Sequence, residues 1–269
     1  MTDATRNGPP RLFDPDLRAQ RRARAARDFA AHDFLHAYAA GLVAEKLMDV
    51  NRSFASAQIS GDPSGLVSAA LPPGKITLTT QGPLDLIVSL LELHAANDPI
   101  GAMIEARQRL APDGLFIAVM FGAGTLAELR TALGEAEIET TGGLSPRVFP
   151  FADVRDAGSL LQRAGFALPV ADGDRLIVRY AEPLKLLADL RGAGESNILT
   201  DRRRSFLRRD TLMRALALYA RRSADADGRV PATFQFVTMT GWRPHESQQQ
   251  PLKPGSGAVS LTEALKRKD

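Results

Sequence analysis

The stretch Leu84–Gly122, LDLIVSLLELHAANDPIGAMIEARQRLAPDGLFIAVMFG, decides the fold. It begins with an apolar run, Leu84–Leu91, broken by only two polar residues, which is typical of a strand buried on both faces. The cap-and-proline turn at 97–99 predicts a helix start, the Pro-Asp-Gly turn at 112–114 its stop, and Leu115–Phe121 a second strand. A right-handed crossover makes the two strands parallel, so the sequence predicts an α/β protein.

Three later segments narrow the fold class. They read SPRVFPFADVRDAGSLLQRAGF (145–166), DLRGAGESN (189–197) and TGWRPHESQQQPLKPGS (240–256). Together with the first stretch they resemble class I S-adenosylmethionine (SAM) methyltransferases, from about Leu12 to Gly255. The branch they resemble contains the malonyl-carrier-protein methyltransferase of biotin synthesis and a mitochondrial complex I assembly factor that hydroxylates an arginine.

The resemblance implies a Rossmann-like class I methyltransferase sheet with added helices. A helical arm, residues 16–49 with a possible break near 31–33, should precede the sheet, and a helical insertion at 180–230 should precede the last strand. We expect a disordered tail at 1–10, a methyltransferase-like domain at 11–250 and a flexible tail at 251–269, where a capping-box pattern at Ser260–Glu263 suggests a short helix.

The loop that holds SAM in this family is degenerate here. The family has an acidic residue near the end of its first strand and then a GxGxG loop, but Ile59 replaces the acid and Pro63 the middle glycine. Proline fixes φ and removes a backbone donor. SAM is the cofactor that the resemblance implies, and we expect it to bind weakly or not at all. The candidate cofactor-binding residues are Ser60, Gly61, Gly65 and Ser89.

The sheet is predicted to lack one strand. Only Gln81–Pro83 separate a short strand at 75–80 from Leu84, and no carboxylate lies between Gly65 and Asp85 to hold a ribose. Leu84–Leu91 should therefore lie between the strands at 54–59 and 115–121, with an antiparallel strand at 232–240. Further helices are expected at 66–71, 124–139, 155–165, 183–192 and 210–222, and an antiparallel strand pair at 166–170 and 176–180 around Asp172-Gly173.

Five polar or aromatic residues are candidates for catalysis, namely His94, Arg147, Glu195, Trp242 and His245. His94 follows a strand where a class I site opens, although a histidine satisfied at a strand end is an open alternative. Arg147 could bind a carboxylate or phosphate, or clamp its own loop. The loops Ser145–Asp153, Gly192–Asn197 and Trp242–Gln249 are predicted to form one site at the carboxyl edge of the sheet.

Composition excludes several classes of function. The 269 residues contain no cysteine and four histidines, and no metal site is expected, because the helical pair His32 and His36 has no third ligand nearby. Two arginine-rich runs, at 18–27 and 202–209, lack interleaved aromatic residues, so nucleic-acid binding is not expected. No apolar run is long enough to span a membrane and no signal-peptide pattern is present, so a cytoplasmic location is predicted.

Two functions are compatible with these features. The first is a SAM-dependent methyltransferase-family protein that modifies a protein or carrier-bound substrate. The second is a non-catalytic, degenerate methyltransferase fold that acts as a binding or assembly factor, for example for respiratory complex I.

Overall fold

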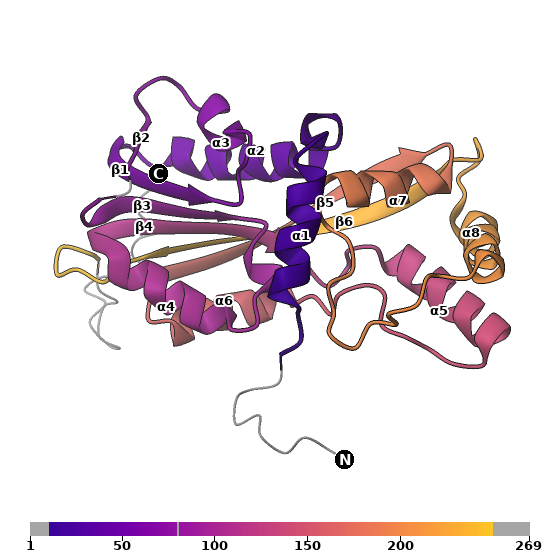
Figure 1. Ribbon diagram of the computed structural model, residues 1–269. Helices are drawn as coiled ribbons and strands as arrows, with labels where there is room; N and C mark the ends of the chain where they lie inside the picture. The colour runs from indigo at the N-terminus through magenta and orange to yellow at the C-terminus, as the bar shows by residue number, and fades with distance from the viewer. Residues whose placement is uncertain (1–10, 80, 250–269) are drawn as a thin grey trace, which may run out of the picture.

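The structure, a computed structural model, describes residues 11–79 and 81–249, and a six-stranded sheet lies at its centre. The strand order is β2-β1-β3-β4-β6-β5 (Figure 1). The first four strands of this order are parallel, and β6 runs antiparallel to β4 and β5. The strands are β1 (Phe54–Ser60), β2 (Ile76–Leu78), β3 (Leu84–Leu90), β4 (Leu110–Phe121), β5 (Ala167–Tyr180) and β6 (Val230–Trp242).

The predicted arrangement around β3 is confirmed. β3 lies between β1 and β4, and the antiparallel β6 follows on the other side of β4. Within the described residues no further strand separates β2 from β3, as the short connection at 81–83 predicts. The sheet is therefore that of a class I methyltransferase with one strand missing.

Two hydrophobic clusters, one on each face of the sheet, explain why β3 and β4 are almost continuously apolar. On one face, Leu86 and Val88 pack with residues of α2 (Phe34–Asp49) and α3 (Leu66–Ala69). On the other face, Leu84 and Ile87 pack with residues of α4 (Pro99–Arg109) and α6 (Val154–Arg163) (Figure 1). A strand covered on both faces has no position for solvated polar side chains.

A group of helices extends the molecule beyond the strand ends. Helices α5 (Ala127–Thr141), α7 (Pro183–Gly192) and α8 (Arg209–Ser223) pack beside one another, and α1 (Pro15–Ala25) crosses in front of the sheet (Figure 1). The remaining helical segments are the short 3-10 turns η1 (Phe29–Ala31) and η2 (Leu93–Ala95). The N-terminal arm is thus broken between α1 and α2, and α7 and α8 form the predicted insertion before the last strand.

The predicted antiparallel pair around Asp172-Gly173 is wrong. β5 is one uninterrupted strand of 14 residues, and Asp172 and Gly173 pair with Thr238 and Val237 of β6 instead of forming a turn. The physical reason is that β6 is long enough to bond β5 along its whole length, so a ladder replaces the turn. The only irregularity in that ladder is a register shift between Ala167 and Val170.

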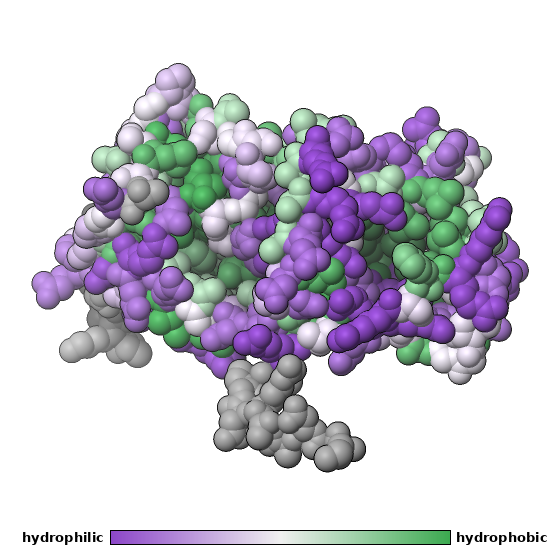
Figure 2. Space-filling view, in the orientation of Figure 1, coloured by the Kyte–Doolittle hydropathy of each residue, from purple (hydrophilic) through white to green (hydrophobic). Residues whose placement is uncertain are grey.

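The predicted tails at 1–10 and 251–269, with the capping box at 260–263, lie outside the described residues. Within the described part of the chain, no helix has the length and apolarity needed to cross a membrane. Figure 2 shows hydrophilic side chains along α1 and a hydrophobic area beside them, on the side where α7 and α8 lie in Figure 1.

Candidate functional site

The carboxyl ends of the parallel strands lie beneath α1. β1, β3 and β4 end at Ser60, Leu90 and Phe121, and the segment after β3 meets α1 through backbone and side-chain contacts. Arg18 and Arg22, one turn apart on α1, both donate to the Leu91 carbonyl at 3.0 Å. This edge is where α/β proteins bind ligands, and here a helix of the same chain covers it.

A partly buried network of charges joins α1 to the loop after α7. Glu92 accepts from Arg18 at 2.9 Å and from Arg22, while the other amino group of Arg22 lies 3.5 Å from Glu195. Glu195 in turn lies 3.0 Å from Nε2 of His94. Since an ionised carboxylate only accepts hydrogen bonds, this geometry places a proton on Nε2 of His94.

Glu195 is ionised despite its burial. Only 7% of its side chain is exposed, and 1% of the His94 side chain. Burial acts to raise the pKa of Glu195, but His94, Arg22 and Arg18 outweigh it and lower that pKa to about 2. The network is therefore a charge-compensated unit that fixes the loop after α7 to the sheet edge.

Aromatic rings surround His94. Its ring centroid lies 4.9 Å from that of Phe121, 5.9 Å from Phe151 and 6.2 Å from Phe149. Nδ1 of His94 is buried and has no hydrogen-bond partner among the described residues. Within the described residues, His94 therefore has one ring nitrogen with a hydrogen-bond partner and one without, which is compatible both with a catalytic role and with a histidine held at a strand end.

Arg147 clamps its own loop to α5. Its guanidinium donates to both oxygens of Glu137, at 2.7 and 3.2 Å, and Ser145 donates to the same carboxylate through its hydroxyl and its backbone N–H. Burial acts to raise the pKa of Glu137, but the hydrogen bonds from Arg147 and Ser145 lower it to about 2. Of the two roles considered for Arg147, these contacts fit the structural one, in which the side chain clamps its own loop.

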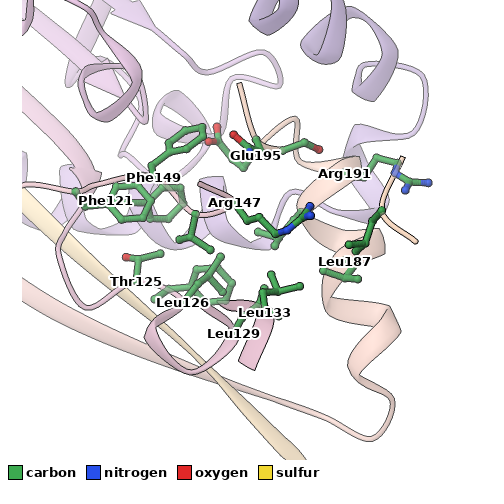
Figure 3. Close-up of a pocket in the computed structure, with 17 residues that line it drawn as sticks. Phe121, Thr125, Leu126, Leu129, Leu133, Arg147, Phe149, Leu187, Arg191 and Glu195 are labelled. Atoms are coloured by element: carbon green, nitrogen blue, oxygen red, sulfur yellow. The ribbon is translucent and has the colours of Figure 1, made fainter. Parts of the chain in front are cut away.

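Two of the three predicted loops meet. Asn197 donates to the Pro146 carbonyl at 2.8 Å, which joins the loop after α7 to the loop after α5. Beside this contact is a cavity of about 250 Å³. Figure 3 shows Arg147 and Glu195 at it, with leucine side chains of α5 and α7 opposite. Its labelled lining residues are Phe121, Thr125, Leu126, Leu129, Leu133, Arg147, Phe149, Leu187, Arg191 and Glu195.

The third predicted loop lies elsewhere, and the single-site prediction is wrong. Trp242 pairs with Leu115 in the middle of β4, whereas Phe121 at the end of β4 lines the cavity. The Trp242 ring packs under Arg52, 5.4 Å from its guanidinium, and His245 is exposed, with Nδ1 2.7 Å from the Ser247 hydroxyl. Because β6 is antiparallel to β4, the end of β6 lies at the amino edge of the parallel strands.

Three of the four candidate cofactor-binding residues, Ser60, Gly61 and Ser89, lie at the ends of β1 and β3, whereas Gly65 is the residue before α3. Ser60 pairs with Ser89, and the Ser60 hydroxyl donates to the Val88 carbonyl at 3.2 Å. Gly61 has φ of +78°, and a Cβ there would lie 1.8 Å from the Leu90 carbonyl oxygen. Close packing of two strands, with no ligand involved, therefore requires a glycine at this position.

The groups present at this edge do not match what SAM needs. Asp62 accepts from the N–H groups of Leu66 and Val67 at 2.8 and 2.9 Å, so the start of α3 is already capped by the chain itself. Pro63 has no N–H, and Arg22 lines the cavity of about 320 Å³ next to it. The sequence has no carboxylate between Gly65 and Asp85, and Glu92, which lines the same cavity, is paired with Arg18 and Arg22.

Sequence reasoning missed the residues that organise the edge. Arg18 and Glu92 are not among the candidate residues, since an arginine-rich helix normally indicates a solvated face. A signal was present: Arg18 and Arg22 are four residues apart and so lie on one side of α1. Among the described residues no group of three or more histidines or acids is placed to hold a metal ion.

The chain is similar to several known proteins. The mouse protein named arginine-hydroxylase NDUFAF5, mitochondrial, is 36% identical over 96% of this chain and 85% of its own, and the human one is 36% identical over 94% and 83%. A malonyl-[acyl-carrier protein] O-methyltransferase of Laribacter hongkongensis is 35% identical over 67% of this chain and 58% of its own. Among solved structures, the YcgJ protein of Bacillus subtilis covers 77% of this chain and 99% of its own, with 11% identity and a TM-score of 0.48. No family profile matches the sequence.

The strand order and the antiparallel last pair define a class I methyltransferase fold that lacks one strand. Within that class, the identity to the mouse and human proteins over nearly the whole chain shows that this protein belongs to the NDUFAF5 arginine-hydroxylase family. The same relatives contradict the expected cytoplasmic location, because their names place them in mitochondria.

Proposed function

We propose that this protein does not use SAM and acts by binding a polypeptide partner, as an assembly factor with a degenerate methyltransferase fold. The second of the two functions compatible with the sequence is thus the one we favour. The relatives are an arginine hydroxylase, which by its name acts on an arginine, and a methyltransferase whose named substrate is attached to a carrier protein. Both names fit a family that engages other polypeptides.

The single observation that supports this proposal most directly is the capping of α3 by Asp62. A helix N-terminus attracts anionic groups because its first N–H groups have no partner within the helix. At α3 the carboxylate of the preceding loop occupies that position. α3 is also only four residues long, so little of a helix dipole is left for a ligand.

The network of charges between α1 and the sheet edge supports the same proposal. Arg22 is held between Glu92 and Glu195 and lines the cavity beside Gly61. Opening this edge for a cofactor would separate partly buried charges from their partners, which destabilises the protein. Because α1 covers this edge of the sheet and its charges are paired, we infer that the residues at the usual SAM position stabilise the fold and do not bind a cofactor.

Isothermal titration of the full chain with SAM and with S-adenosylhomocysteine tests the proposal. Two missing charge-assisted contacts, each worth about 1.5–3 kcal/mol, weaken binding by roughly two to four orders of magnitude. We therefore expect no saturable heat up to about 1 mM ligand. The Laribacter methyltransferase, titrated in the same buffer, is the positive control. A dissociation constant in the low micromolar range, or SAM retained through purification, would refute the proposal.

A further inference from the structure

The two arginine-rich runs, about 180 residues apart in sequence, lie side by side in the structure. An isolated β-bridge joins Phe13 to Leu199, and Arg202 lies 3.4 Å from the Asp14 carboxylate. Thr200 donates to the Leu12 carbonyl through its backbone N–H at 2.9 Å. These contacts attach the segment between α7 and α8 to the start of α1, so both runs contribute to one surface.

This surface has a surplus of positive charge. A cavity of about 550 Å³ lies between the two runs, lined by arginines of both and by one acid, Asp14, which is already paired with Arg202. Burial and the nearby charges of Arg202, Arg24 and Arg191 lower the pKa of Arg21. Arg202 and Arg203 are paired with Asp14 and Glu137, but Arg21 and Arg204 have no carboxylate within salt-bridge distance among the described residues. Because unpaired like charges destabilise a folded protein, these arginines point to a negatively charged ligand.

The basic cavity continues into the apolar cavity of about 250 Å³ shown in Figure 3. Arg147, Asn197 and Leu207 line both of them. We call the two together the insertion cleft, because α7 and the segment before α8 form one wall. Its arginines are Arg21, Arg147, Arg191, Arg202, Arg203 and Arg204, and its acids are Asp14 and Glu195, each of which has a basic partner.

The inner part of the cleft is apolar. Leucines of α5, α7 and the α7–α8 segment line it, and Phe206 beside the basic part is 98% exposed. The green area bordered by purple side chains in Figure 2 lies on the side of α7 and α8. An apolar centre with a charged border that includes arginine is the usual composition of a protein-binding surface.

We propose that the insertion cleft binds an acidic polypeptide segment, which places one large apolar side chain among the leucines and its carboxylates on the surrounding arginines. This inference deepens the proposed function, on which it rests, by assigning the chemistry of the partner. Guanidinium groups of Arg21 and Arg204 offer planar pairs of donors that match carboxylates.

Other anionic ligands fit the cleft less well. A nucleic acid would need aromatic rings interleaved with the basic residues, and Phe206 is the one aromatic residue that lines the basic cavity. A fatty acid has a single charged group, whereas six arginines line the cleft from end to end. An extended peptide can satisfy several arginines and fill the apolar part at the same time.

Selection from a random-peptide display library tests this inference directly. The library encodes peptides of about 12 residues, which span roughly 40 Å when extended. The full chain is the bait, and binders to the Arg21→Glu, Arg204→Glu double variant are removed first. We expect the enriched peptides to share Leu, Phe or Trp flanked by Asp or Glu. Enrichment of basic or purely polar peptides, or no enrichment over the variant, overturns the inference.

The consensus peptide is then measured by fluorescence anisotropy. Arg21→Glu should weaken its binding at least about fivefold and leave the melting temperature unchanged or higher, because the change relieves repulsion. Arg163→Glu, the same charge change at an exposed position of α6, should leave binding within about twofold. An oligonucleotide or decanoate that displaces the peptide and binds more tightly also overturns the inference.

The two proposals can fail separately. Micromolar SAM binding refutes the proposed function whatever the peptides do. Absent SAM binding together with failed peptide selection refutes only the assignment of the cleft.

Discussion

Within the charged network, substitution of Glu195 should lower the stability of the protein most. A fall in its pKa from 4.5 in the unfolded chain to about 2 in the folded one corresponds to about 3 kcal/mol of stability at neutral pH. Glu195→Gln keeps the shape of the side chain but removes the charge between His94 and Arg22. We therefore expect the free energy of unfolding at pH 7 to fall by about 3 kcal/mol, and the melting temperature by roughly 6–12 °C.

The pH dependence has a definite sign. A carboxyl whose pKa is depressed by folding stabilises the protein above its unfolded pKa, and that contribution is lost as pH falls toward its folded pKa. For Glu195 this loss of stability occurs as the pH falls from about 4.5 to about 2. The difference between wild type and Glu195→Gln should thus shrink from about 3 kcal/mol at pH 7 to about 1.5 kcal/mol at pH 3.

Urea unfolding followed by circular dichroism at several pH values measures this difference. Glu45→Gln, an exposed acid of α2, is the matched control and should change the free energy of unfolding by less than about 0.5 kcal/mol. A Glu195→Gln effect below about 0.5 kcal/mol at pH 7, or one that stays constant down to pH 3, would show that the network does not hold the ionised carboxylate.

Two further predictions concern the packing at Gly61 and the loop held by Arg147. Gly61→Ala places a methyl carbon 1.8 Å from a backbone oxygen and should lower the free energy of unfolding by at least about 2 kcal/mol. Its control, Gly65→Ala, is also at positive φ but has open space around it, and should lower the free energy of unfolding by about 1 kcal/mol. Equal effects of the two substitutions in urea unfolding would contradict the packing role of Gly61. Arg147→Ala leaves the buried Glu137 with only the longer contact to Arg203, at 3.6 Å, and should destabilise the protein by about 3 kcal/mol, measured as a lower melting temperature. An unchanged melting temperature would mean that the loop is held by other contacts.

The sequence alone was sufficient to predict the sheet around β3. Burial on both faces makes a strand apolar throughout, and this property is visible within Leu84–Leu91 without knowledge of its neighbours. The missing strand was equally predictable, because three residues at 81–83 cannot hold a helix and a strand. The damaged cofactor loop was visible for a similar reason, since Ile59 and Pro63 lack the groups that a cofactor needs whatever surrounds them.

Tertiary structure decided how distant segments meet. Asp172-Gly173 reads locally as a turn, but the length of β6 makes it part of a continuous strand. Trp242 belongs to a loop with the same composition as the cleft loops, yet the antiparallel direction of β6 carries it to the opposite edge. The arginines of α1 read as a solvated face until Glu92 and Glu195, 70 or more residues away in sequence, are placed against them. Local patterns record which residues are buried, whereas the direction of a strand and the partner of a charge depend on the whole chain.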